Sequence, residues 1–164
     1  MSSSPVALRP VGRPGDLGWV VERHGAVYAA EYRWDMSFEG LVAEIVAGFA
    51  AGHDPEREGG WIAELEGRRA GSIFCIATGD TDVAALRALM VDPGARRRGI
   101  GRMLIERCIE FAQAAGYRRM ELGTTNDLVD ARRLYDAAGF ELVDEATHPR
   151  FGTTVTSQRL ALAL

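Results

Sequence analysis

Two kinds of hydrophobic pattern alternate along the chain, and together they predict a mixed α/β fold. Apolar residues recur at helical spacing in four segments, residues 17–32, 38–49, 100–115 and 131–138. Short apolar runs typical of strands cover residues 6–11, 61–65, 70–77, 85–91, 120–122, 141–144 and 157–164. The resulting order, β-α-α-β-β-β-α-β-α-β-β, predicts a central mixed sheet with helices on both faces.

The connections between these segments predict the directions of the strands. A short turn at residues 66–69 predicts an antiparallel hairpin on either side of it. The helix at 100–115 is long enough to be a crossover, so the strands before and after it are expected to be parallel neighbours. A chain of 164 residues, 47% of them hydrophobic, fits one domain with its own core, spanning residues 1–164.

The turn after the strand at 85–91 carries the strongest chemical signal in the sequence. Pro93 and Gly94 end the strand, three arginines follow, and Gly99 and Gly101 open the next helix. Free backbone N–H groups and the positive end of the helix dipole meet at such a point and favour an anion. Glycine lets a phosphate approach the backbone, because a Cβ atom at Gly99 or Gly101 is expected to occupy that space.

Three phosphate-binding patterns compete for this turn. The P-loop pattern lacks its lysine and its hydroxyl after the second glycine. The dinucleotide pattern Gly-x-Gly-x-x-Gly matches Gly99 and Gly101 but has Leu104 at its third position, although Glu121 stands where a ribose-binding acid is expected. The third pattern, Arg-x-x-Gly-x-Gly, is met in full at residues 96–101.

The third pattern has a companion further along the chain. Val91-x-Pro93 precedes it, and residues 131–140 read Ala-Arg-Arg-Leu-Tyr-Asp-Ala-Ala-Gly-Phe. In this order and separation, the two motifs resemble the pyrophosphate loop and the later Ala-x-x-Leu-Tyr-x-x-x-Gly-Phe helix of the GNAT superfamily of acyl-CoA N-acyltransferases. The resemblance covers most of residues 60–164 and implies a GNAT-like fold with acetyl-CoA as co-substrate.

By this resemblance, the coenzyme lies between the strand at 85–91 and the strand that follows the crossover helix. Backbone groups at Leu89 and Val91 would pair with the pantetheine chain as an added strand. The expected coenzyme-binding residues are Leu89, Met90, Val91, Arg96, Arg97, Arg98, Gly99, Ile100, Gly101, Arg102 and Asn126. Asn126 is included because Leu128 stands where many family members have a coenzyme-binding asparagine.

Two residues are candidates for proton transfer during direct attack of an amine on the thioester. By resemblance, Tyr135 would protonate the departing thiolate, whereas its helical spacing alone fits a core residue. Many family members carry a glutamate where this chain has Gly123, and Glu121 shares that face of the strand. Glu121 is therefore the candidate base, directly or through a water, and a surface carboxylate paired with Arg118 or Arg119 is the alternative.

The acceptor pocket is expected to come from the first two helices and the loop between them. Acidic and aromatic side chains cluster there and suit a cationic amine: Glu31, Tyr32, Trp34, Asp35 and Glu39. The alternative is that these residues simply line a loop between two helices. Arg33 and the arginines downstream would equally admit an acceptor with a carboxylate, such as an amino acid.

These features predict an N-acetyltransferase that moves an acetyl group from acetyl-CoA to a primary amine of a small molecule, amino acid or peptide. The alternative from another class is a non-catalytic acyl-CoA-binding or sensor domain, which Gly123 favours. A nucleotide-binding domain that prefers NAD is the third hypothesis. Residues 23–39 and 148–152 also resemble a narrower GNAT subgroup often fused behind a MarR-type DNA-binding domain, and no such domain is expected within these 164 residues.

Composition argues against several other classes. The net charge of −4 disfavours binding to nucleic acid, no run reaches the length of a membrane span, and the three histidines show no metal-ligand spacing. Cys75 and Cys108 give no disulfide framework, and the first residues lack a signal-peptide pattern, so a cytoplasmic protein is expected. The sequence leaves the oligomeric state open, with a homodimer as one expectation.

Overall fold

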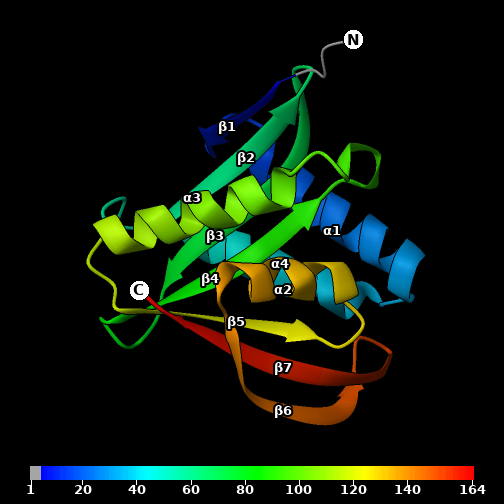
Figure 1. Ribbon diagram of the computed structural model, residues 1–164. Coiled ribbons are helices and arrows are strands. Elements are labelled where there is room, and N and C mark those ends of the chain that lie inside the picture. Colours follow the sequence, from blue (N-terminus) through cyan, green and yellow to red (C-terminus); the bar gives the residue numbers. More distant parts are fainter. Residues whose placement is uncertain (1–4) are drawn as a thin grey trace.

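The computed structural model describes residues 5–164 and shows one seven-stranded sheet with helices on both faces (Figure 1). The strands are β1 (Val6–Pro10), β2 (Gly59–Leu65), β3 (Arg68–Ala77), β4 (Val83–Val91), β5 (Arg119–Thr125), β6 (Glu141–Arg150) and β7 (Thr153–Ala163), in the sheet order β1-β2-β3-β4-β5-β7-β6. The α-helices are α1 (Asp16–Tyr32), α2 (Met36–Ala50), α3 (Ile100–Ala114) and α4 (Val129–Ala138). The predicted mixed α/β architecture and its element order are confirmed.

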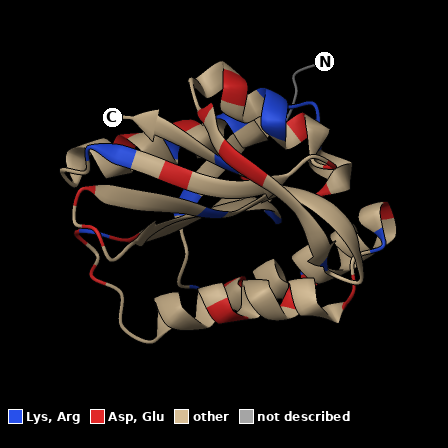
Figure 2. Ribbon diagram, turned by 90° about the horizontal axis from the view of Figure 1, so that it is seen from below, with Lys and Arg blue, Asp and Glu red and all other residues tan. Residues whose placement is uncertain are grey.

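Two hydrophobic cores lie on opposite faces of the sheet, because successive side chains of a strand point to opposite sides. On β3, Ile73 and Cys75 belong to the core under α3 and α4, whereas Phe74 belongs to the core under α1 and α2. Cys108 on α3 is fully buried against the first of these cores. Basic and acidic residues are both present on α1 and α3, whereas α2 carries acidic residues and no Lys or Arg (Figure 2).

The strands β4 and β5 separate in the middle of the sheet. They pair in parallel only where Val83–Ala85 faces Arg119–Glu121, and both strands continue beyond that point without pairing to each other. On its other side, β4 carries a bulge opposite β3, where Ala88 adopts a left-handed conformation with φ of 51°. The result is an opening between two neighbouring strands (Figure 1), which positions the candidate site.

The last two strands are longer than the sequence pattern predicts. We expected strands at 141–144 and 157–164, whereas β6 and β7 form a hairpin that pairs from Glu141 with Ala161 to Arg150 with Thr153. Almost every residue of β6 is exposed, so β6 shows none of the apolar alternation that signals a half-buried strand.

Residues 1–4, on which the expectation about a signal peptide rests, lie outside the described residues. Within residues 5–164, no helix is long and apolar enough to cross a membrane.

Candidate active site

The start of α3 presents a row of free backbone donors. Within the described chain, the N–H groups of residues 97–102 have no hydrogen-bond acceptor, and the first amide bonded to this turn is that of Met103, which donates to the carbonyl of Gly99 at 3.0 Å. Gly99 caps the helix in the left-handed region, with φ of 75°, and no side chain caps the turn. Such a row of donors at a helix N-terminus is suited to a pyrophosphate.

The arginines around this turn differ in their partners. Arg96 forms an ion pair with Glu31 on α1, with 2.8 Å between Nη2 and Oε1, and Arg102 pairs with Glu106 one turn along α3. Arg97 and Arg98 are exposed and make no ion pair within residues 5–164. These two side chains are therefore the ones free to neutralise a bound anion.

The two glycines of the turn have different roles. A Cβ atom at Gly99 would meet open space, but φ there is unfavourable for other residues. A Cβ atom at Gly101 would lie 2.6 Å from Cδ1 of Leu134, and Gly101 is buried. The expectation that Gly101 clears space for a phosphate is therefore wrong, because its missing side chain lets α3 pack closely against α4. The amide of Gly101 is still available to an anion.

The free edge of β4 continues from this turn towards the opening. Asp92 donates its N–H to Ala70 on β3, at 2.8 Å, and N–H groups alternate between the two edges of a strand. The N–H groups of Val91 and Leu89 consequently face the side where β5 has moved away. These groups are therefore free for an extended chain, and the expected pairing of Leu89 and Val91 with pantetheine stays a prediction. Met90, also among the expected residues, is buried and faces β3 through its pairing with Ser72.

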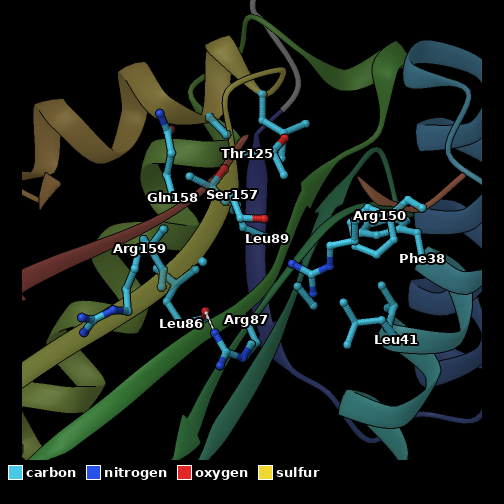
Figure 3. Close-up of a pocket in the computed structure, with 18 of the residues that line it drawn as sticks. Phe38, Leu41, Leu86, Arg87, Leu89, Thr125, Arg150, Ser157, Gln158 and Arg159 are labelled. Atoms are coloured by element: carbon cyan, nitrogen blue, oxygen red, sulfur yellow. Dashed lines mark hydrogen bonds between the residues drawn. The ribbon is translucent and has the colours of Figure 1, made fainter. Parts of the chain in front are cut away.

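The opening leads into a cavity of about 500 Å³. Its walls come from α1, α2, β4, β5, α4 and the β6–β7 hairpin. In Figure 3, Phe38 and Leu41 of α2 lie on one side, Leu86 and Leu89 of β4 lie in the middle, and Ser157 and Gln158 of β7 lie on the other side. Segments from both ends of the chain therefore build the cavity, and α4 contributes Tyr135 to it.

The side chain of Tyr135 is buried, at 5% exposure, and lines this cavity. Its ring packs edge-on against Phe140, with 5.8 Å between the ring centroids. Its hydroxyl makes no hydrogen bond with any described residue. Burial raises the pKa of Tyr135 above its usual value, so the hydroxyl is protonated at neutral pH. The ring is part of the core, as its helical spacing predicts, whereas protonation of a departing thiolate by the hydroxyl stays a prediction.

Glu121 lies on β5 at the cavity wall and is held by two arginines. Its Oε1 accepts from Arg119 Nε at 2.9 Å and from Arg159 Nη1 at 3.2 Å. Of the two partners expected from the sequence, Arg119 is the one found, and Arg118 instead contacts Asp82. The neighbouring Gly123 also lines the cavity, and a Cβ atom there would meet nothing within 4 Å.

Asn126 supports the hairpin in this structure. It follows β5 and is exposed, and its Oδ1 accepts a hydrogen bond from the N–H of Thr156 at 3.2 Å. It does not line the cavity, so its expected contact with the coenzyme stays a prediction.

The acidic cluster expected at the acceptor site does not face the cavity. Glu31 pairs with Arg96, and Asp35 caps α2 by accepting from the N–H of Ser37 at 3.0 Å. Of the five residues in that cluster, only Trp34 lines the cavity. The carboxylates of Glu31 and Asp35 are used for contact with the arginine turn and for helix capping, which favours the alternative that the cluster lines the helix–helix loop. A role of the cluster in binding a cationic amine stays a prediction.

Four buried polar atoms at the cavity wall have no partner, and of the residues that carry them the sequence pointed to Trp34 alone as an acceptor-site residue. They are His24 Nε2, Trp34 Nε1, Thr124 Oγ1 and Thr125 Oγ1. His24 Nδ1 donates to the carbonyl of Val20 at 2.7 Å, which leaves an acceptor lone pair on Nε2. Because buried polar groups are nearly always paired, four such atoms around one cavity indicate a polar ligand.

A charged residue in the middle of β4 was also missed. Arg87 lines the cavity and is half-buried, between the buried Leu86 and the bulge at Ala88. The available signal was one arginine inside the apolar run at 83–91.

Comparisons with known proteins point to one family. The model of the acetyltransferase (GNAT) family matches residues 19–140. The N-acetylaspartate synthetase of Xenopus tropicalis is 34% identical over 88 residues, which is 54% of this chain and 32% of that protein. The mycothiol acetyltransferase of Beutenbergia cavernae is 38% identical over 73 residues, 44% of this chain and 24% of that protein. The chain thus spans less than a third of the length of these two curated relatives.

Solved structures share the fold over nearly the whole chain. A putative phosphinothricin N-acetyltransferase has a TM-score of 0.78 at 20% identity, covering 98% of this chain and 99% of that one. The structure of yncA, a putative acetyltransferase from Salmonella typhimurium with its cofactor acetyl-CoA, has a TM-score of 0.75 at 19% identity, covering 98% and 95%. The family match extends from α1 across the arginine turn and α4, and the chain belongs to the acetyltransferase (GNAT) family.

Proposed function

We propose that this chain transfers an acetyl group from acetyl-CoA to a primary amine by direct attack of the amine on the thioester. One observation carries the proposal. The free N–H groups at the start of α3 lead along the unpaired edge of β4 to a cavity in which the hydroxyl of Tyr135 has no partner. The phosphate end, the extended chain and the reactive end of one coenzyme match these three features in that order.

Acetyl-CoA supplies the thioester, and the residues of this chain bind it and move protons. The amides of residues 97–102, with Arg97 and Arg98, neutralise the pyrophosphate. Leu89 and Val91 hold the chain by their N–H groups. The new N–C bond forms as the C–S bond breaks, and Tyr135 donates its proton to the thiolate that leaves. Both cysteines are buried in the core, which fits attack without an enzyme nucleophile.

Glu121 is our candidate for the base that receives the proton of the amine. It lines the cavity beside Gly123, where open space is available for a water molecule or for the acceptor. Two arginines hold its carboxylate in place, so we expect a water to carry the proton from the amine to Glu121.

The second candidate function is a coenzyme-binding sensor domain without catalysis. The observation that favours it is the absence of any side chain at Gly123. Thiol release from acetyl-CoA across a panel of amines, amino acids and peptides separates the two functions. Amine-dependent release supports the transferase, and tight coenzyme binding without release across the panel supports the sensor.

The choice of coenzyme can be tested separately. Coenzyme A and acetyl-CoA are expected to raise the melting temperature by mass action, and NAD and ATP much less. Stronger stabilisation by NAD than by coenzyme A would overturn the assignment of the phosphate site.

Three further features belong to the same proposal. The Arg-His-Gly motif at residues 23–25 and the hairpin turn at 148–152 support membership of the subgroup often fused to MarR-type domains. The two unpaired, buried cysteines support a reducing, cytoplasmic setting. The exposed Leu142 and Val143 on the edge strand β6 support a homodimer.

A further inference from the structure

Arg87 is the one half-buried arginine among the three that line the cavity. Its guanidinium is half-buried and makes no ion pair with any residue of 5–164. The hydrogen bond to the carbonyl of the adjacent Leu86 is long, at 3.5 Å (Figure 3). Burial lowers the pKa of Arg87, while the charge of Glu121 opposes that shift. Because arginine stays protonated in proteins, the structure carries a desolvated positive charge without a direct partner.

The other charges of the cavity leave this positive charge uncompensated. Arg159 binds both carboxylates of the cavity wall, with 3.2 Å to Glu121 and 2.6 Å to Asp144. Arg150, the third arginine, lies over the ring of Phe151 at 4.6 Å and makes no ion pair within the described chain. Two of the three arginines are thus unpaired, in a protein whose net charge is −4. The cavity wall therefore carries more arginine side chains than carboxylates.

A carboxylate would satisfy the unpaired donors of this cavity. Guanidinium groups bind carboxylates through two parallel hydrogen bonds, and the N–H of Trp34 offers a further buried donor without a partner. In the same wall, His24 Nε2 offers an acceptor suited to an N–H donor. The unpaired groups therefore complement a ligand that carries both a carboxylate and an amine.

We propose that the acceptor is an amino acid or another amine that carries a carboxylate, and that Arg87 binds this carboxylate. The inference rests on the proposed function and names its substrate class. Arg87 is a specificity-determining residue in this account. Arg150, the last residue of β6, lies beside Phe38 in the cavity (Figure 3) and assists electrostatically.

Matched pairs of amines test the proposal. Acetyl transfer from acetyl-CoA is measured for glycine and methylamine, L-leucine and isopentylamine, and L-phenylalanine and phenethylamine. Each pair differs in the carboxylate. The expected result is a kcat/KM at least about 30-fold higher for the amino acid in one pair or more, because a desolvated charge pair is lost in the amine. Equal or higher values for the amine in every pair would overturn the proposal.

Substitution of Arg87 assigns the effect to this residue. In Arg87→Met, the preference for the amino acid is expected to fall by about 30-fold, with little change for the simple amine. The variant is expected to fold, because the substitution removes an unpaired, half-buried charge. Arg87→Lys keeps the charge and is expected to retain part of the preference. The control is Arg118→Gln, because Arg118 is exposed, contacts Asp82 and does not line the cavity. This variant is expected to leave the preference for the amino acid unchanged. A preference that persists in Arg87→Met contradicts the assignment.

A binding measurement separates failure of this inference from failure of the proposed function. In the presence of coenzyme A, titration calorimetry compares the same amino acids in the wild type and in Arg87→Met. Binding that weakens in the variant supports the carboxylate site even if none of the amines is acetylated. Turnover of simple amines without binding or turnover of any amino acid overturns the carboxylate site and leaves the transferase intact. Absence of both binding and turnover for all amino acids overturns it as well.

Discussion

The proposed coenzyme end of this molecule is built from backbone, whereas the proposed acceptor end is built from side chains. At the coenzyme end, the amides of residues 97–102 are free because α3 starts there, and Gly99 caps the turn. At the acceptor end, the cavity wall combines His24 and Trp34 from one part of the chain with Arg87 and Arg150 from two others. The first site is local in sequence, and the second exists only after folding.

This difference predicts how each site responds to substitution. A backbone site can keep its chemistry while side chains around it change, since the donors belong to every residue. A site made of side chains changes its ligand with each substitution. Four predictions test this contrast, in order of decreasing expected effect.

Tyr135→Phe is expected to give the largest effect on catalysis. The change keeps the packing against Phe140 and removes the hydroxyl, so kcat should fall by about 10²-fold with little change in KM for acetyl-CoA. Steady-state kinetics measure both constants. In Tyr117→Phe, the matched control, the lost hydrogen bond goes to the carbonyl of Arg57, and kcat should stay at the wild-type level. A wild-type kcat in Tyr135→Phe would show that Tyr135 contributes to core packing and not to catalysis.

His24 is expected to make the acceptor end sensitive to acid. Burial lowers the pKa of His24 to about 4, from 6.5. Below pH 6.5 the unfolded chain therefore binds a proton at His24 that the folded chain does not bind until the pH nears 4. The free energy of unfolding should fall as the pH drops from 6.5 towards 4. Between pH 7 and pH 5 the loss should be about 2 kcal/mol.

Denaturant unfolding at both pH values, compared with His24→Phe, measures this loss. The variant should lose less stability over the same interval, because it has no imidazole to protonate. Comparing each protein with itself cancels any constant effect of the substitution. Equal losses in both proteins would show that His24 is not the group responsible.

The two glycines of the arginine turn should separate binding from packing. Gly99→Val places a side chain beside the free amides and should weaken coenzyme A binding by about tenfold, or about 1.4 kcal/mol. Gly101→Val should instead cost about 1 kcal/mol of stability, because its side chain meets Leu134. Calorimetric titration and thermal unfolding of both variants provide the comparison. Unchanged affinity in a folded Gly99→Val protein contradicts the placement of the pyrophosphate.

Glu121→Gln should give the smallest effect, about a fivefold decrease in kcat/KM for the amine near neutral pH. The decrease is small because the carboxylate is paired with Arg119 and Arg159 and acts through water in this account. Glu106→Gln, which removes an exposed partner of Arg102, is the control and should have no effect on the rate. If the two variants behave alike, the base lies elsewhere.

The sequence predicted the fold and the free amides at the start of α3 for a physical reason, whereas the assignment of coenzyme-binding residues stays a prediction. Gly99, the arginines and the apolar spacing of α3 are close together in the chain, so a local pattern describes them. The same holds for the helix that carries Tyr135. In contrast, the exposed strand β6 lacks apolar alternation, and its length follows from pairing with β7. The partners of Glu31 and Asp35 could not be predicted either. Glu31 binds Arg96 and Asp35 caps α2, and a sequence that places these carboxylates close together does not say which partner each one takes.

The central claim is that the two ends act on one reaction, with acetyl-CoA at the backbone site and an amine at the side-chain site. Thiol release from acetyl-CoA, followed with and without added amine and combined with mass spectrometry of the amine, tests it most directly. The account predicts release that depends on the amine, with an N-acetylated product in equal amount. Tight binding of acetyl-CoA with no amine-dependent release for any amine, amino acid or peptide would contradict it.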